Sequence, residues 1–193
     1  QAGGVSLPWD RVQKYGDPHK GFGHLKQLLI LRHAKSDWKA DFDSDHGRPL
    51  AKRGIRAARL MGRFISKLDL QPDLILSSTA VRARATSELA SQSGRWSCPM
   101  VLCDEFYGSS PSRVLSVVQA QDATHSRLLL TGHEPTWSGL VGALTGGGDP
   151  RMPTAALARV DLPIEDWSDL RAGVGTLHWL VSPKLLLAMG SGG

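Results

Sequence analysis

The stretch Leu28-Leu29-Ile30-Leu31-Arg32-His33-Ala34-Lys35-Ser36 decides the fold of this chain. Four apolar residues in a row precede Arg32 and His33, after which the sequence turns small and polar. Continuous apolar runs are typical of parallel strands that are buried on both faces. The pattern predicts a buried strand that brings a histidine to the carboxyl edge of a sheet, where open α/β proteins bind ligands. An arginine beside an imidazole suits a phosphoryl group, because the guanidinium forks onto oxygens while a ring nitrogen attacks phosphorus.

Short apolar runs and helical patterns alternate along the rest of the chain. The expected strands are 27–32, 74–77, 100–103, 127–131, 157–161 and 176–181. The expected helices are 51–68, 81–91, 112–120 and 136–144. This alternation predicts an α/β fold, a three-layer α/β/α sandwich around a mainly parallel sheet. The arginines of the first helix are expected to form a solvated face.

Length and composition fit one globular domain. The chain has 193 residues, of which 41% are hydrophobic and 21% charged, which is enough for a substantial core. Glycines and prolines interrupt residues 1–25, which we expect to form an extended or disordered arm. We assign 26–188 to a single domain and 189–193 to a flexible tail.

The net charge and the arrangement of charged and apolar residues limit the classes of binding partner that we expect. The net charge of +5, from 23 basic and 18 acidic side chains, fits an anionic substrate. No basic tract is interleaved with aromatic residues, so nucleic-acid binding is not expected. No apolar run approaches the roughly 20 residues of a membrane span, and we expect neither membrane association nor a secretory signal. Two cysteines make no disulfide framework, which favours a reducing compartment: the cytoplasm, with an organellar stroma or matrix left open.

Polar and cationic groups follow several of the expected strands or lie in the loops that lead into helices. In a doubly wound sheet these loops converge on one edge. They would bring together Arg32, His33, Arg48, Arg82 and His133. Three guanidiniums and two imidazoles repel one another unless a dianion lies among them. The charge arithmetic therefore predicts a phosphate site.

Here the chain resembles the histidine phosphatase superfamily, whose fold is phosphoglycerate mutase-like. The motifs that carry the resemblance are, in chain order, Arg32-His33-Ala34-Lys35-Ser36, Arg48-Pro49-Leu50, Arg82 after Ser78, and Gly132-His133-Glu134-Pro135. The segments Met152-Pro153-Thr154-Ala155-Ala156 and Trp179-Leu180-Val181-Ser182-Pro183 are similar to the small SixA-type phosphohistidine phosphatases in particular.

The resemblance implies a role for each member of the cluster. His33 would be the nucleophile and would become phosphorylated. Arg32, Arg48 and Arg82 would clamp the phosphoryl oxygens, and His133 would donate a hydrogen bond to them. Three guanidiniums offset the oxygen charge, so neither a metal nor another cofactor is expected.

Other positions are left open by the sequence. Glu105 and Asp104 both lie in the loop after the third strand, where larger relatives carry a proton-donating Glu, and the spacing does not choose between them. Lys35 stands where many relatives have a glycine. Its side chain either adds positive charge at the rim of the phosphate site or is solvated. Thr154 either lines the pocket or is a loop hydroxyl.

The leading hypothesis is a phosphatase that removes phosphate from phosphohistidine on a protein partner. The chain has little room for the long insertions that cover the site in large relatives, and an open, shallow site suits a phosphorylated side chain of another protein. The alternatives are a phosphomonoesterase acting on a small phosphate ester and a non-catalytic phosphate-binding adaptor. The oligomeric state is left undetermined.

Overall fold

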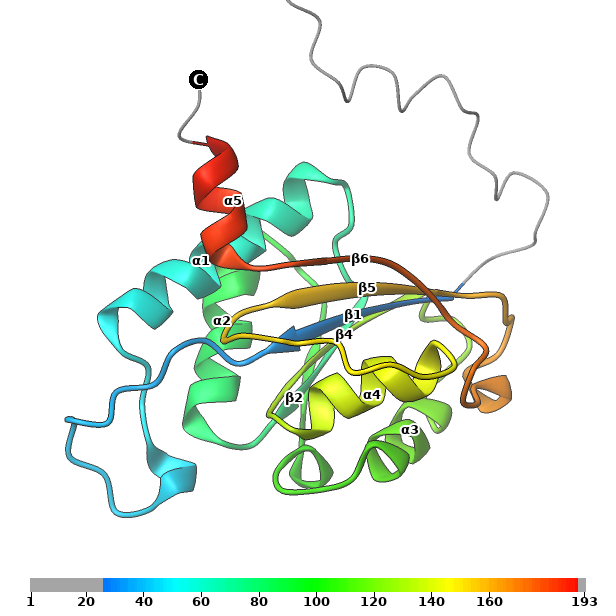
Figure 1. The fold of residues 1–193 in the computed structure, drawn as a ribbon, viewed down its shortest axis with the longest axis horizontal. Coiled ribbons are helices and arrows are strands. Elements are labelled where there is room, and N and C mark those ends of the chain that lie inside the picture. The colour runs from blue at the N-terminus through cyan, green and yellow to red at the C-terminus, as the bar shows by residue number, and fades with distance from the viewer. Residues whose placement is uncertain (1–25, 191–193) are drawn as a thin grey trace, which may run out of the picture.

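The computed structural model describes residues 26–190 and consists of one mixed sheet with helices on both faces (Figure 1). The expected arm 1–25 and residues 191–193 lie outside the described residues. The strands are β1 (Lys26–Arg32), β2 (Leu74–Ser78), β3 (Met100–Cys103), β4 (Arg127–Gly132), β5 (Leu157–Leu162) and β6 (Thr176–Val181). The helices are α1 (Lys52–Lys67), α2 (Val81–Gly94), α3 (Pro111–Gln119), α4 (Thr136–Leu144) and α5 (Pro183–Gly190). Short 3₁₀ turns are η2 (Asp45–Gly47), η3 (Asp104–Phe106) and η4 (Trp167–Asp169).

The sheet has the strand order β3-β2-β4-β1-β5-β6. Three of its five strand pairs are parallel, and the two pairs that involve β5 are antiparallel. The expectation of a mainly parallel sheet is thereby confirmed.

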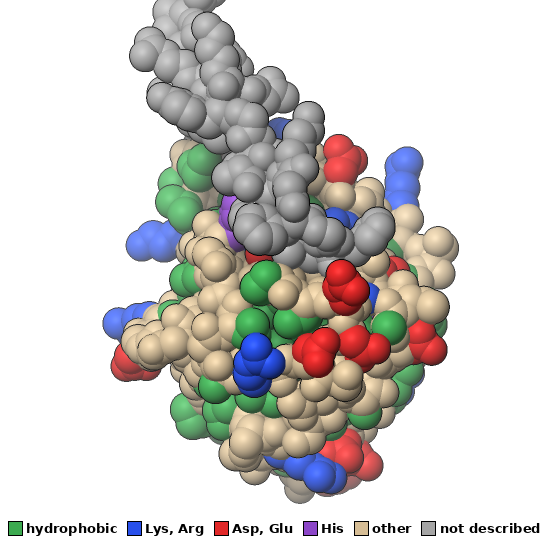
Figure 2. All heavy atoms as spheres, turned by 90° about the vertical axis from the view of Figure 1, so that its right-hand side faces the viewer, with side chains coloured by type: hydrophobic (Ala, Val, Ile, Leu, Met, Phe, Trp, Pro, Cys, Tyr) green, Lys and Arg blue, Asp and Glu red, His purple; other side chains and the backbone are tan. Residues whose placement is uncertain are grey.

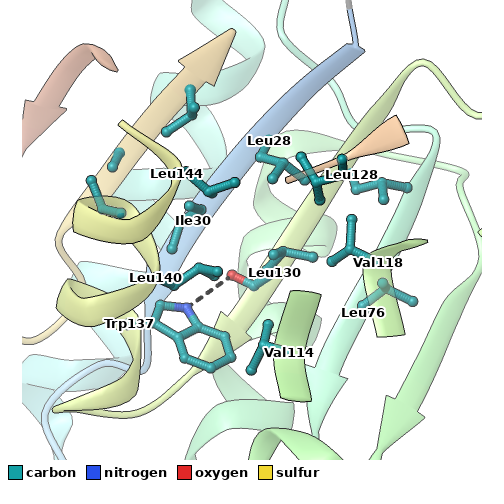
Figure 3. Packing of buried hydrophobic residues seen from close by; sticks show 14 of the residues in the cluster. Leu28, Ile30, Leu76, Val114, Val118, Leu128, Leu130, Trp137, Leu140 and Leu144 are labelled. Atoms are coloured by element: carbon teal, nitrogen blue, oxygen red, sulfur yellow. Dashed lines mark hydrogen bonds between the residues drawn. The ribbon is translucent and has the colours of Figure 1, made fainter. Parts of the chain in front are cut away.

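Side chains of the central strands alternate between two cores, which makes the fold three-layered. Leu28 and Ile30 face the cluster that holds the buried residues of α3 and α4, whereas Leu29 and Leu31 face the cluster under α1. A strand buried on both faces must be apolar at every position, which explains the unbroken run in the sequence. Trp137 on α4 anchors the first cluster, where its indole N–H donates to the carbonyl of Leu130 over 3.4 Å (Figure 3).

The expected elements differ from the observed ones mainly at their ends. Helix α2 runs to Gly94, three residues beyond the expected end, and α3 begins at Pro111 because the Ser110 side chain caps it. Helix α5 was not expected. Its apolar sequence Leu185-Leu186-Leu187-Ala188-Met189 lacks helical periodicity, and it includes the start of the segment we assigned to a flexible tail. Among residues 26–190 we find no helix with the length and apolar content of a membrane span.

Charged groups are distributed unevenly over the surface. The face on the right of Figure 1, seen head-on in Figure 2, carries acidic and basic side chains interspersed among neutral ones. Charges of both signs are not mixed along α1, which contains six Lys and Arg residues and no acid.

Candidate active site

Three neighbouring parallel strands, β2, β4 and β1, bring the predicted site residues to one edge of the sheet. β1 ends at Arg32 and is followed by His33, β4 is followed by His133, and β2 ends at Ser78. The two imidazole rings have centroids 4.9 Å apart. The expected convergence of the two histidines is therefore found, because strands adjacent in the sheet end side by side.

The loop after His33 is fixed by hydrogen bonds from three sides. The His33 backbone N–H donates to the carbonyl of Gly132 over 2.9 Å, and the Ala155 N–H donates to the carbonyl of His33 over 3.1 Å. The Ala34 N–H donates to Oγ1 of Thr86 on α2 over 3.0 Å. The nucleophile candidate is thus held by β4, α2 and the segment before β5.

Arg48 reaches the site because the chain after Ser36 folds back on itself. The Asp37 N–H donates to the carbonyl of Pro49 over 2.8 Å, and the Ala51 N–H donates to the carbonyl of Lys35 over 2.9 Å. Gly54 permits this close approach, since a Cβ there would lie 2.1 Å from the Lys35 carbonyl oxygen.

His33 has a defined tautomer. Its Nδ1 lies 2.7 Å from the carbonyl oxygen of Ala34, and because a carbonyl only accepts, Nδ1 carries the proton. The lone pair is then on Nε2, where it accepts a hydrogen bond from Nε of Arg82 over 3.4 Å. Burial, together with the charges of Arg82, Arg32 and Arg48, lowers the pKa of His33 to about 4, against the opposing effect of the Ala34 hydrogen bond. The ring is therefore neutral at pH 7, and a phosphoryl group that takes over the Arg82 Nε–H would leave the lone pair of Nε2 free for attack.

His133 is the second buried imidazole of the pair. Its Nε2 lies 2.8 Å from Oγ of Ser78, which also accepts the N–H of Ala80. Its Nδ1 is buried and has no hydrogen-bond partner among residues 26–190. Burial, followed by the proximity of His33 and Arg82, lowers the pKa of His133 to about 3, so this ring is also neutral.

The three predicted arginines surround the histidine pair. Arg48 and Arg82 are 6% and 5% exposed. Arg32 donates to the carbonyl of Met152 over 2.8 Å, and Arg48 donates to Oγ of Ser36 over 2.7 Å. Nε of Arg32 and Nε of Arg48 are buried without a partner in the described part of the chain. Buried donors without partners are rare in proteins, and these two guanidinium N–H groups are suited to an oxyanion.

Asp45 is a site residue that the sequence reasoning missed. Its carboxylate accepts from Arg48 over 2.6 Å and from Arg82 over 2.8 Å, so it bridges the two guanidiniums. The hydroxyl of Tyr107 donates to the same carboxylate over 3.0 Å. Despite the opposing effect of desolvation, the Tyr107 hydrogen bond and the arginines hold the pKa of Asp45 below its usual value. The only signal in the sequence was an acid three residues before Arg48.

The loop after β3 contributes Tyr107 to this cluster, whereas among residues 26–190 no hydrogen bond or ion pair joins the side chain of Glu105 or Asp104 to it. Glu105 accepts from Arg113 on the surface over 3.3 Å, and the Asp104 side chain is exposed. β3 lies three places from β1 in the sheet, roughly 14 Å at the usual strand spacing. The ring of Tyr107 lies edge-on to His133 at 5.3 Å.

Lys35 and Thr154 line a cavity that is separate from the histidine pair. This cavity of about 920 Å³ lies between α1, α5 and the segment before β5, and neither of the two histidines lines it. Residues 26–190 contain no group of three His, Cys, Asp or Glu side chains arranged to hold a metal ion.

The solved structure of the protein histidine phosphatase SixA complexed with tungstate superimposes on this chain with a TM-score of 0.73. It is 28% identical, and the match covers 83% of this chain and 99% of the other. Phosphohistidine phosphatase SixA of Escherichia coli K12 is 29% identical over 163 residues, which cover 81% of this chain and 94% of that protein.

The chain also matches an uncharacterised protein and a family model. An uncharacterised protein of Mycobacterium tuberculosis is 34% identical over 164 residues, which span 80% of this chain and the whole of that protein. Residues 28–108 match the model of the histidine phosphatase superfamily, branch 1. The chain therefore belongs to the histidine phosphatase superfamily.

Proposed function

We propose that this phosphatase removes the phosphoryl group from phosphohistidine on a protein partner, with Nε2 of His33 as the nucleophile. The observation that carries the proposal is the state of His33. Its proton is held on Nδ1 by the carbonyl of Ala34, and its pKa is lowered to about 4. A neutral, oriented imidazole amid guanidiniums is what attack on a phosphoryl dianion requires.

In this proposal the three arginines and His133 bind the oxygens of the phosphoryl group. The partnerless Nε atoms of Arg32 and Arg48 supply two charged donors. In the proposed arrangement the Ser78 hydroxyl, which accepts the N–H of Ala80, donates its own proton to Nε2 of His133. This leaves a proton on Nδ1 of His133, which donates to an oxygen whose charge grows during transfer.

The reaction divides into two displacements. First, Nε2 of His33 bonds to phosphorus while the bond from phosphorus to the substrate nitrogen breaks. That nitrogen keeps the electron pair, and a substrate ring protonated on its distal nitrogen leaves as neutral imidazole. Water then adds to phosphorus, the bond to Nε2 breaks, and dihydrogen phosphate departs from neutral His33.

The chemistry of the leaving group makes phosphohistidine a better substrate for this site than a phosphate ester. An ester oxygen needs a proton from a positioned acid, whereas a protonated imidazole needs none. In the described part of the chain, neither the Glu105 nor the Asp104 side chain is hydrogen-bonded or ion-paired to the cluster, and Glu105 is paired with Arg113 instead. Two relatives are named phosphohistidine or protein histidine phosphatases, which agrees with this substrate class.

We further propose that the reaction needs no metal, since three guanidiniums balance the oxygen charge, and that activity is unchanged by EDTA. We assign the enzyme to a reducing compartment, the cytoplasm or an organellar stroma or matrix. Cys98 and Cys103 are both free thiols, and an Arabidopsis thaliana relative, 28% identical over 171 residues, is described as chloroplastic.

The test is intact-protein mass spectrometry after rapid mixing with a phosphohistidine peptide, quenched at neutral to alkaline pH because acid hydrolyses phosphohistidine. Release of inorganic phosphate is followed in parallel. We expect turnover by the wild-type protein and a one-phosphate adduct that maps to His33, and neither in His33→Ala.

Other outcomes lead to the alternatives. Rapid cleavage of a sugar or nucleotide phosphate without activity on phosphohistidine peptides would instead indicate a small-molecule phosphomonoesterase. Binding of the phosphopeptide with no turnover of any phosphate compound, in both the wild type and His33→Ala, would indicate an adaptor.

A further inference from the structure

A basic groove is lined by residues of α1 and α5, two helices that contact each other and lie next to one another in Figure 1. It is the cavity of about 920 Å³ described above, and its cationic lining consists of Lys35, Arg53, Arg56, Arg59, Arg63 and Lys184. No acidic residue lines it, and in residues 26–190 no carboxylate oxygen lies within 4 Å of any of these cations. The scattered charges on the face in Figure 2 form no comparable cluster.

The arginines of the groove share one side of α1 by their spacing. They recur at intervals of three or four residues, which an α-helix places on one face. The buried residues of α1, among them Ala58, Met61 and Ile65, lie on the opposite face. Like charges on adjacent turns repel one another, so the arginine face raises the energy of the unliganded helix. An anionic partner relieves this repulsion.

The groove is lined by cations from two helices and by apolar residues. Arg59 and Arg63 belong to α1, whereas Lys184 belongs to α5, which packs onto the core under α1 through Leu186. The apolar lining includes Leu60 of α1, Pro183 of α5 and Pro153 of the segment before β5. Apolar contacts flanked by cations on two sides suit a polypeptide segment in which acidic and apolar side chains alternate.

Other polyanions fit this groove less well. Single-stranded nucleic acid binds on aromatic stacking platforms, and no aromatic residue lines the groove. A bilayer surface is recognised by an apolar face that inserts between lipids. Leu185 and Met189 of α5 are exposed but do not line the groove, whose apolar lining lies between two helices.

Two residues that line the groove are close to His33 along the chain or through a hydrogen-bonded neighbour. Lys35 is two residues from His33, and Thr154 precedes Ala155, whose N–H donates to the carbonyl of His33. A protein that presents a phosphorylated side chain to His33 therefore has the groove within reach of the chain that flanks that side chain. We infer that the basic groove binds an acidic polypeptide segment of the phosphorylated partner. The inference rests on the proposed function for the identity of the partner, but the binding itself does not require catalysis.

The first experiment measures binding without chemistry. A fluorescein-labelled, unphosphorylated peptide of alternating Glu and Leu is titrated with the full chain, and fluorescence anisotropy is followed at low and at physiological salt. We expect saturable binding that weakens as salt rises. The groove variant Arg59→Gln/Arg63→Gln should weaken binding about threefold to tenfold, the sum expected for two exposed ion pairs.

Two further variants sharpen the experiment. Arg84→Gln/Arg171→Gln removes the same number of charges outside the groove and should bind the peptide as the wild type does. Lys184→Gln weakens binding from the opposite wall. All altered side chains are exposed, and unchanged thermal unfolding confirms that each variant is folded.

The second experiment measures turnover. We expect kcat/KM for a phosphohistidine peptide with an acidic flank to exceed that for a peptide with a neutral flank. The groove variant should remove this difference by raising KM for the acidic peptide, with kcat unchanged.

The outcomes of the two experiments decide the inference. Equal binding by the groove and control variants, or tighter groove-dependent binding of a single-stranded oligonucleotide or of phosphatidylglycerol vesicles, would overturn the inference. Groove-dependent peptide binding by a protein that hydrolyses no phosphohistidine would support the groove and refute the proposed function.

Discussion

Nε of Arg82 lies 3.4 Å from Nε2 of His33, the ring nitrogen that carries the lone pair. The same guanidinium donates to the Asp45 carboxylate over 2.8 Å. Arg82 therefore touches both the nucleophile and the acid that bridges the arginines. A dianion attacked by Nε2 would meet this guanidinium at the start of the reaction.

Arg82→Gln should lower kcat about 100-fold to 1000-fold, the usual loss when one charged donor to the transition state is removed. The measurement is phosphate release from a phosphohistidine peptide at saturating substrate. Arg84→Gln is the matched control, since Arg84 lies two residues on, is exposed and pairs only with Glu88 among the described residues. If the two variants were equally active, Arg82 would have no part in transfer.

The buried histidines make stability depend on pH. Burial lowers the pKa of His33 to about 4 and that of His133 to about 3, from 6.5 in the unfolded chain. Below pH 6.5 the unfolded chain binds more protons, so the stability present above 6.5 is lost as the pH falls toward 4. Each histidine should lower the free energy of unfolding by at most about 1.4 kcal/mol per pH unit in that window.

Urea unfolding at a series of pH values measures this slope. His33→Gln and His133→Gln should each reduce the slope between about pH 6.5 and 4, because glutamine does not titrate. His178→Gln is the control, because that side chain is 44% exposed. A slope that both site variants leave unchanged would contradict the assignment of neutral, buried rings.

Much of the fold was predictable because its central strands are buried on both sides. The run Leu28–Leu31 admits few alternatives, and strand 100–103 agrees with β3 at both ends. Helix α5 escaped prediction because apolar residues follow one another there without helical periodicity. Leu186 packs this helix against the core under α1, a contact that the sequence does not reveal.

The candidate site was predictable where residues follow adjacent strands, and not where a loop reaches back across the sheet. His33 and His133 lie together because β1 and β4 pair in register up to Gly132. Glu105 was a natural candidate by position, yet β3 lies at the edge of the sheet and the side chain turns to Arg113. Tyr107, two residues further on, reaches the cluster through a loop geometry that spacing does not encode.

If Glu105 donates no proton, Glu105→Gln should change kcat on a phosphohistidine peptide less than about twofold, because a protonated imidazole leaves unaided. Steady-state phosphate release is the measurement, with Arg113→Gln as a control that breaks the same surface pair. A loss of tenfold or more confined to Glu105→Gln would restore this residue as the proton donor.

Asp45→Ala should lower kcat/KM about tenfold to hundredfold, because Arg48 and Arg82 would no longer be held by one carboxylate. Asp45→Asn, which keeps one acceptor oxygen, should lose less. The comparison is Asp43→Asn, an exposed acid in the same loop. A gain in kcat/KM on removal of the carboxylate would mean that Asp45 competes with the substrate for the arginines and does not position them.

Gly54→Ala should destabilise the protein by about 1–3 kcal/mol, because the added Cβ would lie 2.1 Å from the Lys35 carbonyl oxygen and the backbone must move. Urea unfolding measures the change. Gly47→Ala is the matched control, since its Cβ would meet only the Ser44 hydroxyl at 3.8 Å. The loop from Lys35 to Arg48 is anchored at this contact, so Gly54→Ala should also raise KM. If Gly54→Ala had normal stability but a raised KM, the contact would position Arg48 without contributing to the packing of α1. If neither stability nor KM changed, the loop would move away from the added Cβ at no energetic cost.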